Sequence, residues 1–429
     1  MSRAVPSSER VIAVYIATTA AFTFAASLIW AINTLFLMGA GLNIFEVMVT
    51  NAAFMVGQLV FEVPTGVVAD TVGRRVSFMA GIATLVAATV LYVLTAQMHW
   101  GLWVFVFASV LIGLGFTFQT GAVDAWLVDA LDFVGYEAPK ERVFARAGMF
   151  SGAAMLLGTI VGGFLGQVNL VLPYYLRAAV LVVCFVLTAF LMRDYGFKPR
   201  PLKVSRFGEE TRTIFDAGVK FGWRNPVVRP LLWVSLFSGL FFIFGFYSLP
   251  PYLLSLLGKD YVWLASVVVA GFTVASIAGN ATTKWFMQGR NGRRSPGGVL
   301  AVAAALTAGA AAVVGLVGLV TPASAHGWLP FGIAAGLFVG VGFIQGVTQP
   351  VRQGFINEQI PSAQRATVLS LDSFFGDAGG TVGSLGLGYI SQVGSIGLAW
   401  VISSLALAVG YPLYRSAERA ARKAEPPSA

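Results

Sequence analysis

The sequence predicts an all-α membrane protein with 12 transmembrane helices, and its composition is the first reason. Of the 429 residues, 57% are hydrophobic and only 11% are charged, whereas soluble proteins carry about 25% charged residues. A spanning helix needs about 20 apolar residues, so the roughly 245 hydrophobic residues are enough for twelve. This composition excludes a soluble enzyme, a nucleic-acid-binding module and a disordered chain.

The second reason is the division of the chain into apolar segments of spanning length. Turn-forming residues such as Pro173, Pro322 and Gly394 separate these segments. The first run is far longer than the apolar region of a signal peptide and is therefore expected to stay as a helix. The predicted helices cover residues 11–37, 44–68, 76–97, 102–130, 143–167, 173–193, 231–257, 262–287, 297–320, 328–352, 366–391 and 396–415.

The third reason is the distribution of basic residues, which explains the net charge of +9. With a cytoplasmic N-terminus and twelve spans, all of the 28 Lys and Arg residues except Lys259 and Arg177 fall on or near the cytoplasmic side. A wrong helix count would scramble this asymmetry. We therefore expect both termini in the cytoplasm, and the short loops suit the plasma (inner) membrane of a bacterium.

A long basic linker divides the chain into two halves of six helices. The predicted parts are an N-terminal half at 1–195, a cytoplasmic linker at 196–230, a C-terminal half at 231–415 and a cytoplasmic tail at 416–429. Within the linker, residues 206–222 can form an amphipathic helix on the membrane surface.

The two halves share short motifs at matching positions. Gly73-Arg74-Arg75 follows the second predicted helix, and Gly292-Arg293-Arg294 follows the eighth. Arg146-Ala147 and Arg365-Ala366 begin helices five and eleven at the same spacing between the halves. Transporters are often built from such repeats, so we expect two pseudo-symmetric halves.

The motif after the second helix carries a family resemblance. It places Gly66, Asp70, Gly73, Arg74 and Arg75 in the order glycine, carboxylate, glycine and basic pair. This pattern resembles the signature of the major facilitator superfamily. The resemblance implies the major facilitator fold and covers about residues 10 to 415.

The resemblance also implies a gate. In the family this loop latches the two halves, and Asp70 would contact the start of helix eleven at Arg365. Some features of the family's drug–proton antiporters are missing. Ser109 stands where they have an arginine, and the Gly-Pro pair of helix five is absent around Gly162.

Carboxylates inside the membrane are costly and usually functional, which makes them candidates for proton coupling. Asp377 lies about 16 Å into helix eleven, near the midplane. Alternatively, Asp377 has a structural role beside Gly376. Asp372 is five residues earlier, so the two side chains point about 140° apart and are not expected to face one cavity together. Glu62 and Asp124 are further candidates for a proton relay. The alternative, that they belong to a gating network, is slightly favoured.

Aromatic and amide side chains on the inner helices are candidates for substrate binding. An aromatic, mostly uncharged cavity suits a hydrophobic or cationic solute, although the same residues can pack between helices or face lipid. These candidates are Tyr15, Phe22, Trp30, Asn51, Gln58, Phe237, Phe241, Gln345 and Gln349.

The remaining reactive residues predict neither an enzyme nor a metal site. Cys184 is the only cysteine, and His99 and His326 fall in outer loops. No cofactor is expected. Arg177 begins helix six and is predicted to extend its charge to the interface, and no arginine or lysine is expected at the midplane.

The sequence therefore predicts a secondary active transporter that exports a small hydrophobic or cationic solute in exchange for protons, by alternating access. Its partners would be the solute, protons and the lipid bilayer, with no nucleic acid, and the chain is expected to be a monomer. The alternatives are a facilitator or importer of a neutral nutrient such as a sugar, a lipid flippase or a membrane receptor that does not transport.

Overall fold

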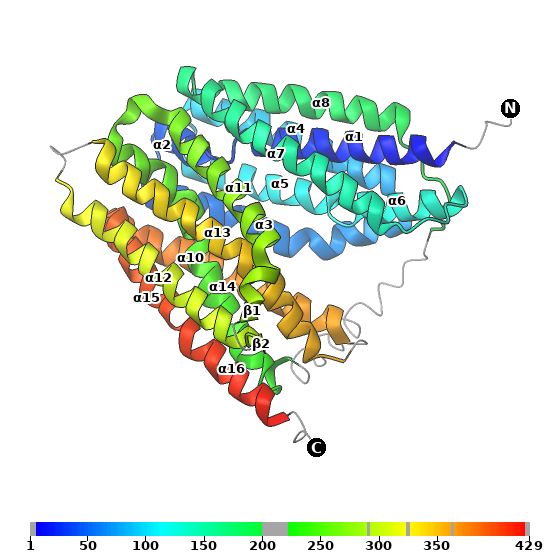
Figure 1. The fold of residues 1–429 in the computed structure, drawn as a ribbon. Coiled ribbons are helices and arrows are strands. Elements are labelled where there is room, and N and C mark those ends of the chain that lie inside the picture. Colours follow the sequence, from blue (N-terminus) through cyan, green and yellow to red (C-terminus); the bar gives the residue numbers. More distant parts are fainter. Residues whose placement is uncertain (1–5, 200–221, 290–291, 323–326, 362–363, 425–429) are drawn as a thin grey trace, which may run out of the picture. The chain divides into compact units, whose positions relative to one another are not determined.

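The computed structural model of the protein describes residues 6–199, 222–289, 292–322, 327–361 and 364–424, and these ranges are almost entirely helical (Figure 1). The exceptions are short: a 3-10 turn at Lys259–Tyr261 and an antiparallel hairpin of β1 (Gln288–Gly289) and β2 (Gly292–Arg293). The predicted amphipathic segment at 206–222 lies outside the described residues except for Gly222.

Two compact units make up the chain. The first contains residues 1–202 together with 262–267, and the second contains 203–261 and 268–429. The first unit is built from α1 (Ser8–Ser27), α2 (Asn33–Gly39), α3 (Ile44–Thr71), α4 (Arg74–Met98), α5 (Leu102–Gln119), α6 (Ala122–Phe133), α7 (Glu141–Val168) and α8 (Leu172–Leu191).

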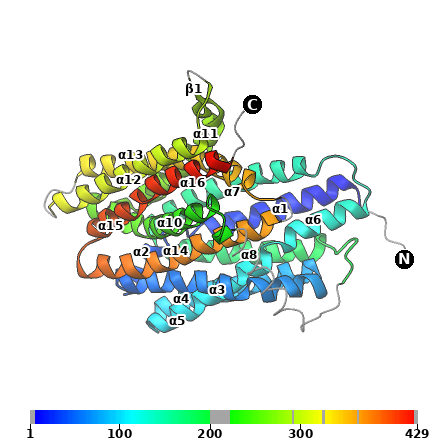
Figure 2. The same cartoon turned by 90° about the horizontal axis from the view of Figure 1, so that it is seen from below.

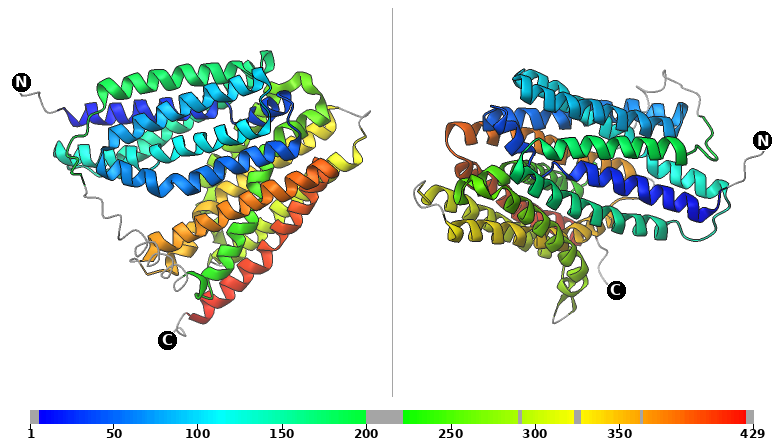
Figure 3. Two further views of the ribbon diagram at one scale, coloured as in Figure 1. Left: turned by 180° about the vertical axis from the view of Figure 1, so that it is seen from behind. Right: turned by 90° about the horizontal axis from the view of Figure 1, so that it is seen from above.

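The second unit is also a bundle of long helices. It contains α10 (Val228–Leu257), most of α11 (Val262–Met287), α12 (Pro296–Val320), α13 (Trp328–Glu358), α14 (Arg365–Val393), α15 (Ile396–Ala408) and α16 (Gly410–Ala424). Within each unit most helices lie side by side, whereas the end of α11 next to β1 projects away from α12 and α13 (Figures 2 and 3).

Several helices begin where local chemistry favours it. Asn43 caps α3 and accepts from the Glu46 N–H at 3.0 Å, while the Glu46 carboxylate accepts from the Asn43 N–H at 2.9 Å. This reciprocal capping box satisfies two backbone donors at once. Pro173 and Pro296 lie in the first turns of α8 and α12, where the missing N–H costs nothing.

Three of the predicted helices, the first, the fourth and the last, are each interrupted, so the prediction that they are continuous was wrong. The first predicted helix stops at Ser27 and resumes at Asn33, and the fourth is divided between Gln119 and Ala122. Gly121 adopts φ +73, a left-handed conformation that glycine takes without steric cost. The last helix is divided at Val409. None of these breaks changes which segments of the sequence are apolar.

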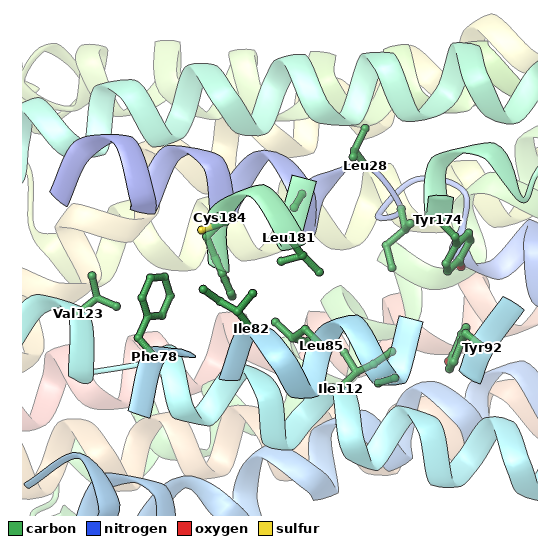
Figure 4. Packing of buried hydrophobic residues seen from close by; sticks show 14 of the residues in the cluster. Leu28, Phe78, Ile82, Leu85, Tyr92, Ile112, Val123, Tyr174, Leu181 and Cys184 are labelled. Atoms are coloured by element: carbon green, nitrogen blue, oxygen red, sulfur yellow. The ribbon is translucent and has the colours of Figure 1, made fainter. Parts of the chain in front are cut away.

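The core of the first unit is an apolar cluster along α1, α4, α5 and α8 (Figure 4). Tyr92 and Tyr174 lie at one end of the drawn cluster, and Phe78 and Val123 lie at the other. Cys184 packs inside it as a free, buried thiol. The cluster fixes the relative positions of the helices that carry the first unit's polar residues.

Close helix packing in the second unit depends on small residues. A Cβ added at Gly239 would lie 2.0 Å from the Gly376 carbonyl oxygen, and one at Gly379 would lie 1.9 Å from that of Leu236. The backbones of α10 and α14 therefore touch, as small residues allow in membrane bundles. This contact positions the face of α14 that carries Asp372 and Asp377.

Eleven helical segments in the described residues are long and apolar enough to cross a membrane. The remaining predicted span, at 366–391, corresponds to α14, which has 29 residues but is more polar than the others. The prediction of an all-α membrane protein is confirmed, while the count of 12 spans depends on α14.

Candidate functional site

The basic motif after α3 organises one end of the first unit. The Arg74 guanidinium forms an ion pair with Asp70 at 2.5 Å and lies 3.7 Å from Asp129 of α6. The Arg75 guanidinium donates to the Ala189 carbonyl at 2.5 Å. The motif therefore joins α3, α4, α6 and α8 within this unit.

Asp194 completes this cluster, and the sequence analysis did not single it out. Its carboxylate accepts from the Arg75 N–H at 2.9 Å, at the start of α4. Gly73 adopts φ +134, and a Cβ there would lie 2.5 Å from an Asp194 oxygen. Burial raises the pKa of Asp194, against the lowering effect of Arg75 and Arg74. Gly66 makes no such contact, since a Cβ on it would meet nothing within 4 Å.

The other two predicted coupling carboxylates lie in the first unit at exposed positions. The Tyr15 hydroxyl donates to Asp124 at 2.6 Å, which joins the start of α6 to α1. Glu62 is exposed on α3. Tyr15 itself is buried, and its hydroxyl is used in this hydrogen bond.

The predicted substrate-binding residues of the first unit are largely packed inside it. Phe22 is 4% exposed and contacts Phe78 and Phe116. Trp30 is partly buried against the core. Asn51 is buried and accepts from Asn33 at 3.0 Å. Gln58 is partly buried on α3.

The prediction for Arg177 was wrong. Its side chain does not extend to an interface but is buried in the first unit with 1% exposure. It donates to the Thr89 hydroxyl at 3.2 Å and to the Ala26 carbonyl at 3.3 Å. Proximity to the helix start indicated an interfacial position, whereas the packing of α8 against α1 and α4 turns the residue inward.

A polar cavity of about 300 Å³ lies within the second unit, and residues from α10, α13, α14 and α16 form its wall. It contains two predicted amides and the predicted coupling carboxylate. The lining residues are Ser235, Ser238, Phe242, Gln345, Thr348, Gln349, Arg352, Asp372, Ser373, Gly376, Asp377 and Tyr414.

An ion pair between α13 and α14 forms the most polar part of this wall. Arg352 donates to the two Asp372 oxygens at 2.6 and 2.8 Å. Ser235 of α10 donates to Asp372 at 2.6 Å and accepts from Arg352 at 2.5 Å. The two charges are largely buried, so the hydrogen bonds from three helices offset part of their desolvation cost.

The sequence analysis missed Arg352 because the predicted helix ended there. The helix α13 instead continues to Glu358. Gln345, Gln349 and Arg352 lie at helical spacing on one face, so the pattern that identified the two amides extends to the arginine. The sequence analysis therefore did not foresee that an arginine lines this cavity.

The expectation that Asp372 and Asp377 do not face one cavity together was wrong, since both line it. Ser373 and Gly376 lie between them on the helix and line it too. The cavity therefore follows about 140° of the α14 surface. Gly376 has no side chain to divide the two carboxylates.

The two aromatic candidates on α10 do not line this polar cavity. Phe237 borders a small void of about 50 Å³ next to it. Phe241 is buried and packs edge-on against Trp400. Arg365 begins α14 and is exposed. Within the described ranges, no three His, Cys, Asp or Glu residues are grouped to hold a metal ion.

Comparison with known proteins identifies the family. The model of the Major Facilitator Superfamily matches residues 14–341. The chain belongs to the Major Facilitator Superfamily. Family members are transport proteins, so the chain is a transporter rather than an enzyme.

Similar members of the superfamily include bacterial resistance proteins. The class B tetracycline resistance protein of Escherichia coli is 24% identical over 359 residues, which cover 80% of this chain and 78% of that protein. The class E protein of Escherichia coli is 27% identical over 143 residues, and the match spans only 33% of either chain. The crystal structure of the nucleoside transporter NupG has a TM-score of 0.74 at 10% identity, covering 95% of this chain and 98% of that one, and supports the fold.

Proposed function

We propose that this transporter exports a small hydrophobic or cationic solute in exchange for protons. The similarity to tetracycline resistance proteins supports this proposal, because resistance by a membrane transporter is expected to involve outward movement of a drug. Transporters built from two repeated halves work by alternating access, and we expect the same mechanism here.

The observation that carries the proposal is the polar cavity of the second unit. Two carboxylates, Asp372 and Asp377, and one guanidinium, Arg352, line it. Their formal charges leave an excess of one negative charge when both carboxylates are ionised. A cavity with low-dielectric walls concentrates ions of the opposite sign, so it favours a proton or an organic cation.

The two carboxylates are expected to have different roles. Asp372 accepts hydrogen bonds from Arg352 and Ser235 and is expected to hold the arginine in place. Asp377 is expected to exchange the proton and bias the equilibrium between two states of the transporter. The Asp70–Arg74 cluster would stabilise one of those states, and Glu62 and Asp124 remain secondary candidates for the proton path.

Transport in proteoliposomes with an enclosed pH-sensitive dye tests this proposal. With an imposed proton gradient, a panel of lipophilic cations and neutral drugs should cause solute-dependent proton movement. Asp377→Asn should abolish this movement while leaving the protein folded, because the amide cannot exchange a proton. Asp132→Asn is the matched control, since Asp132 forms an exposed ion pair with Lys140. Normal coupled transport by Asp377→Asn would overturn the assignment.

A second candidate function is facilitated transport or uptake of a neutral nutrient. The hydroxyls of Ser238 and Thr348 and the amides of Gln345 and Gln349 can bind a polyhydroxylated solute. Solute flux that continues after the proton gradient has been collapsed, with Asp377→Asn fully active, would favour this candidate.

A further inference from the structure

Two hollows on an exposed face of the second unit form one apolar groove along α12 and α13. The first, about 600 Å³, reaches from Phe286 and Arg294 to Leu306. The second, about 420 Å³, continues between Gly309 and Gly340. Leu306 and Ile344 line both, so the hollows are continuous.

The groove is long enough to hold a lipid tail. It follows α12 from Gly298 to Val313, which corresponds to about 22 Å of helix. The hydrocarbon of one leaflet is about 15 Å deep. The end of α11 that carries the β1–β2 hairpin projects away from α12 and α13, next to the mouth at Phe286 (Figures 2 and 3).

Glycine residues, which have no side chain, leave this space open. Cβ atoms added at Gly309, Gly336 or Gly340 would meet no atom within 4 Å. Leu306 is 58% exposed and Val302 is 56% exposed on the same surface. In a bilayer such a surface contacts hydrocarbon, and a linear chain fills a narrow groove better than a bulky side chain of another helix does.

Basic residues gather at one end of the groove. Arg294 is exposed at the mouth, and its N–H donates to the Met287 carbonyl at 2.8 Å, which fixes its backbone. A Cβ at Gly298 would lie 3.7 Å from the Arg415 guanidinium. Glu418 forms ion pairs with Arg415 and Arg422. These three arginines outnumber the one carboxylate, so the mouth is positively charged.

We propose that this groove binds an anionic phospholipid. One acyl chain would lie along α12 and α13, and the phosphate would lie between Arg294 and Arg415. Arginine binds phosphate well because its planar donors match the oxygen geometry. The combination of an apolar groove long enough for a lipid tail with a net positive charge at its mouth fits a phospholipid better than a second protein copy.

The bound lipid would be separate from the transported solute. Thr348 lines both the groove and the polar cavity, but their charged residues differ: Arg294 lines the groove, whereas Arg352, Asp372 and Asp377 line the cavity. Lipid binding should therefore not depend on the Arg352–Asp372 pair.

Lipid retention by the full-length protein tests the proposal. Protein exchanged into detergent would be titrated with phosphatidylglycerol and with phosphatidylcholine of the same chains, and bound lipid counted by native mass spectrometry. The wild type should prefer phosphatidylglycerol. Arg294→Gln should weaken its binding about five-fold, the effect of one cation beside an anionic lipid. Gly340→Leu should weaken both lipids by about four-fold for each displaced CH2.

Two matched variants make the outcome decisive. Gly332→Leu adds the same side chain to α13 at an exposed glycine outside the groove and should bind lipid as the wild type does. Arg142→Gln removes an exposed cation from α7 of the first unit and should also retain lipid, whereas an equal loss there would mean that net charge alone sets the lipid preference and would overturn the proposal. Equal binding of the two lipids, or unchanged binding by Gly340→Leu, would overturn it as well.

Discussion

Arg352 and Asp372 form the polar contact on which the second unit's cavity depends. Their side chains are 20% and 12% exposed, and Ser235 completes the contact from a third helix. Removing one charge leaves the other without its partner in a poorly solvated place, which is costlier than removing both. The pair therefore contributes to stability and function in separable ways.

Arg352→Met should lower the free energy of unfolding by about 3 kcal/mol, because Asp372 then remains buried without its cation. The double variant Arg352→Met, Asp372→Asn should recover most of this loss, yet should not recover coupled transport. A double-mutant cycle of unfolding in detergent measures the coupling of the two residues. Additive losses in the double variant would contradict the assignment of an isolated pair.

Sequence patterns predicted part of this site. Gln345 and Gln349 were recognised because two amides four residues apart share a helix face, and Asp377 because it lies deep in an apolar segment. Arg352 was counted with the basic residues at a helix end, because hydropathy does not show that α13 continues beyond it. Only the contact with Asp372, which comes from a different helix, reveals its position.

At the scale of the elements, the sequence predicted nearly all helices but not their interruptions. The break at residues 28–32 contains no glycine or proline, so no local signal marks it. The division at Gly121 depends on a positive φ that many other glycines of the chain do not adopt. Helix contacts through glycine are also hidden in the sequence, since exposed and packed glycines look alike there.

A pair of substitutions on α14 should separate these two kinds of glycine. Gly379→Ala should destabilise the protein by about 1–3 kcal/mol, because the new Cβ would lie 1.9 Å from the Leu236 carbonyl oxygen and force α10 away. Gly386→Ala should be neutral or slightly stabilising, since its Cβ meets nothing within 4 Å and alanine favours the helix. Thermal unfolding in detergent compares the two, and equal midpoints would contradict the close contact of α10 and α14.

At the scale of the whole molecule, the number of spans decides where the termini lie. Eleven segments of the described chain meet a hydropathy criterion for crossing, and α14 does not. Its polar residues include those that line the cavity, so its low hydropathy has a structural cause. With 29 residues, α14 is about 43 Å long, enough to cross the bilayer. An even number of spans puts the two termini on the same side.

Cysteine labelling in cells tests that conclusion and the predicted orientation together. Cys184 is buried, and Cys184→Ala supplies an unreactive background. Glu9→Cys and Lys423→Cys, both exposed, should react with a membrane-impermeant maleimide only after lysis, because basic residues keep these ends in the cytoplasm. His99→Cys, exposed in a loop of the opposite side, should react in intact cells. Labelling of only one terminus in intact cells would mean that α14 does not cross, and its carboxylates could then not lie at the depth that proton coupling requires.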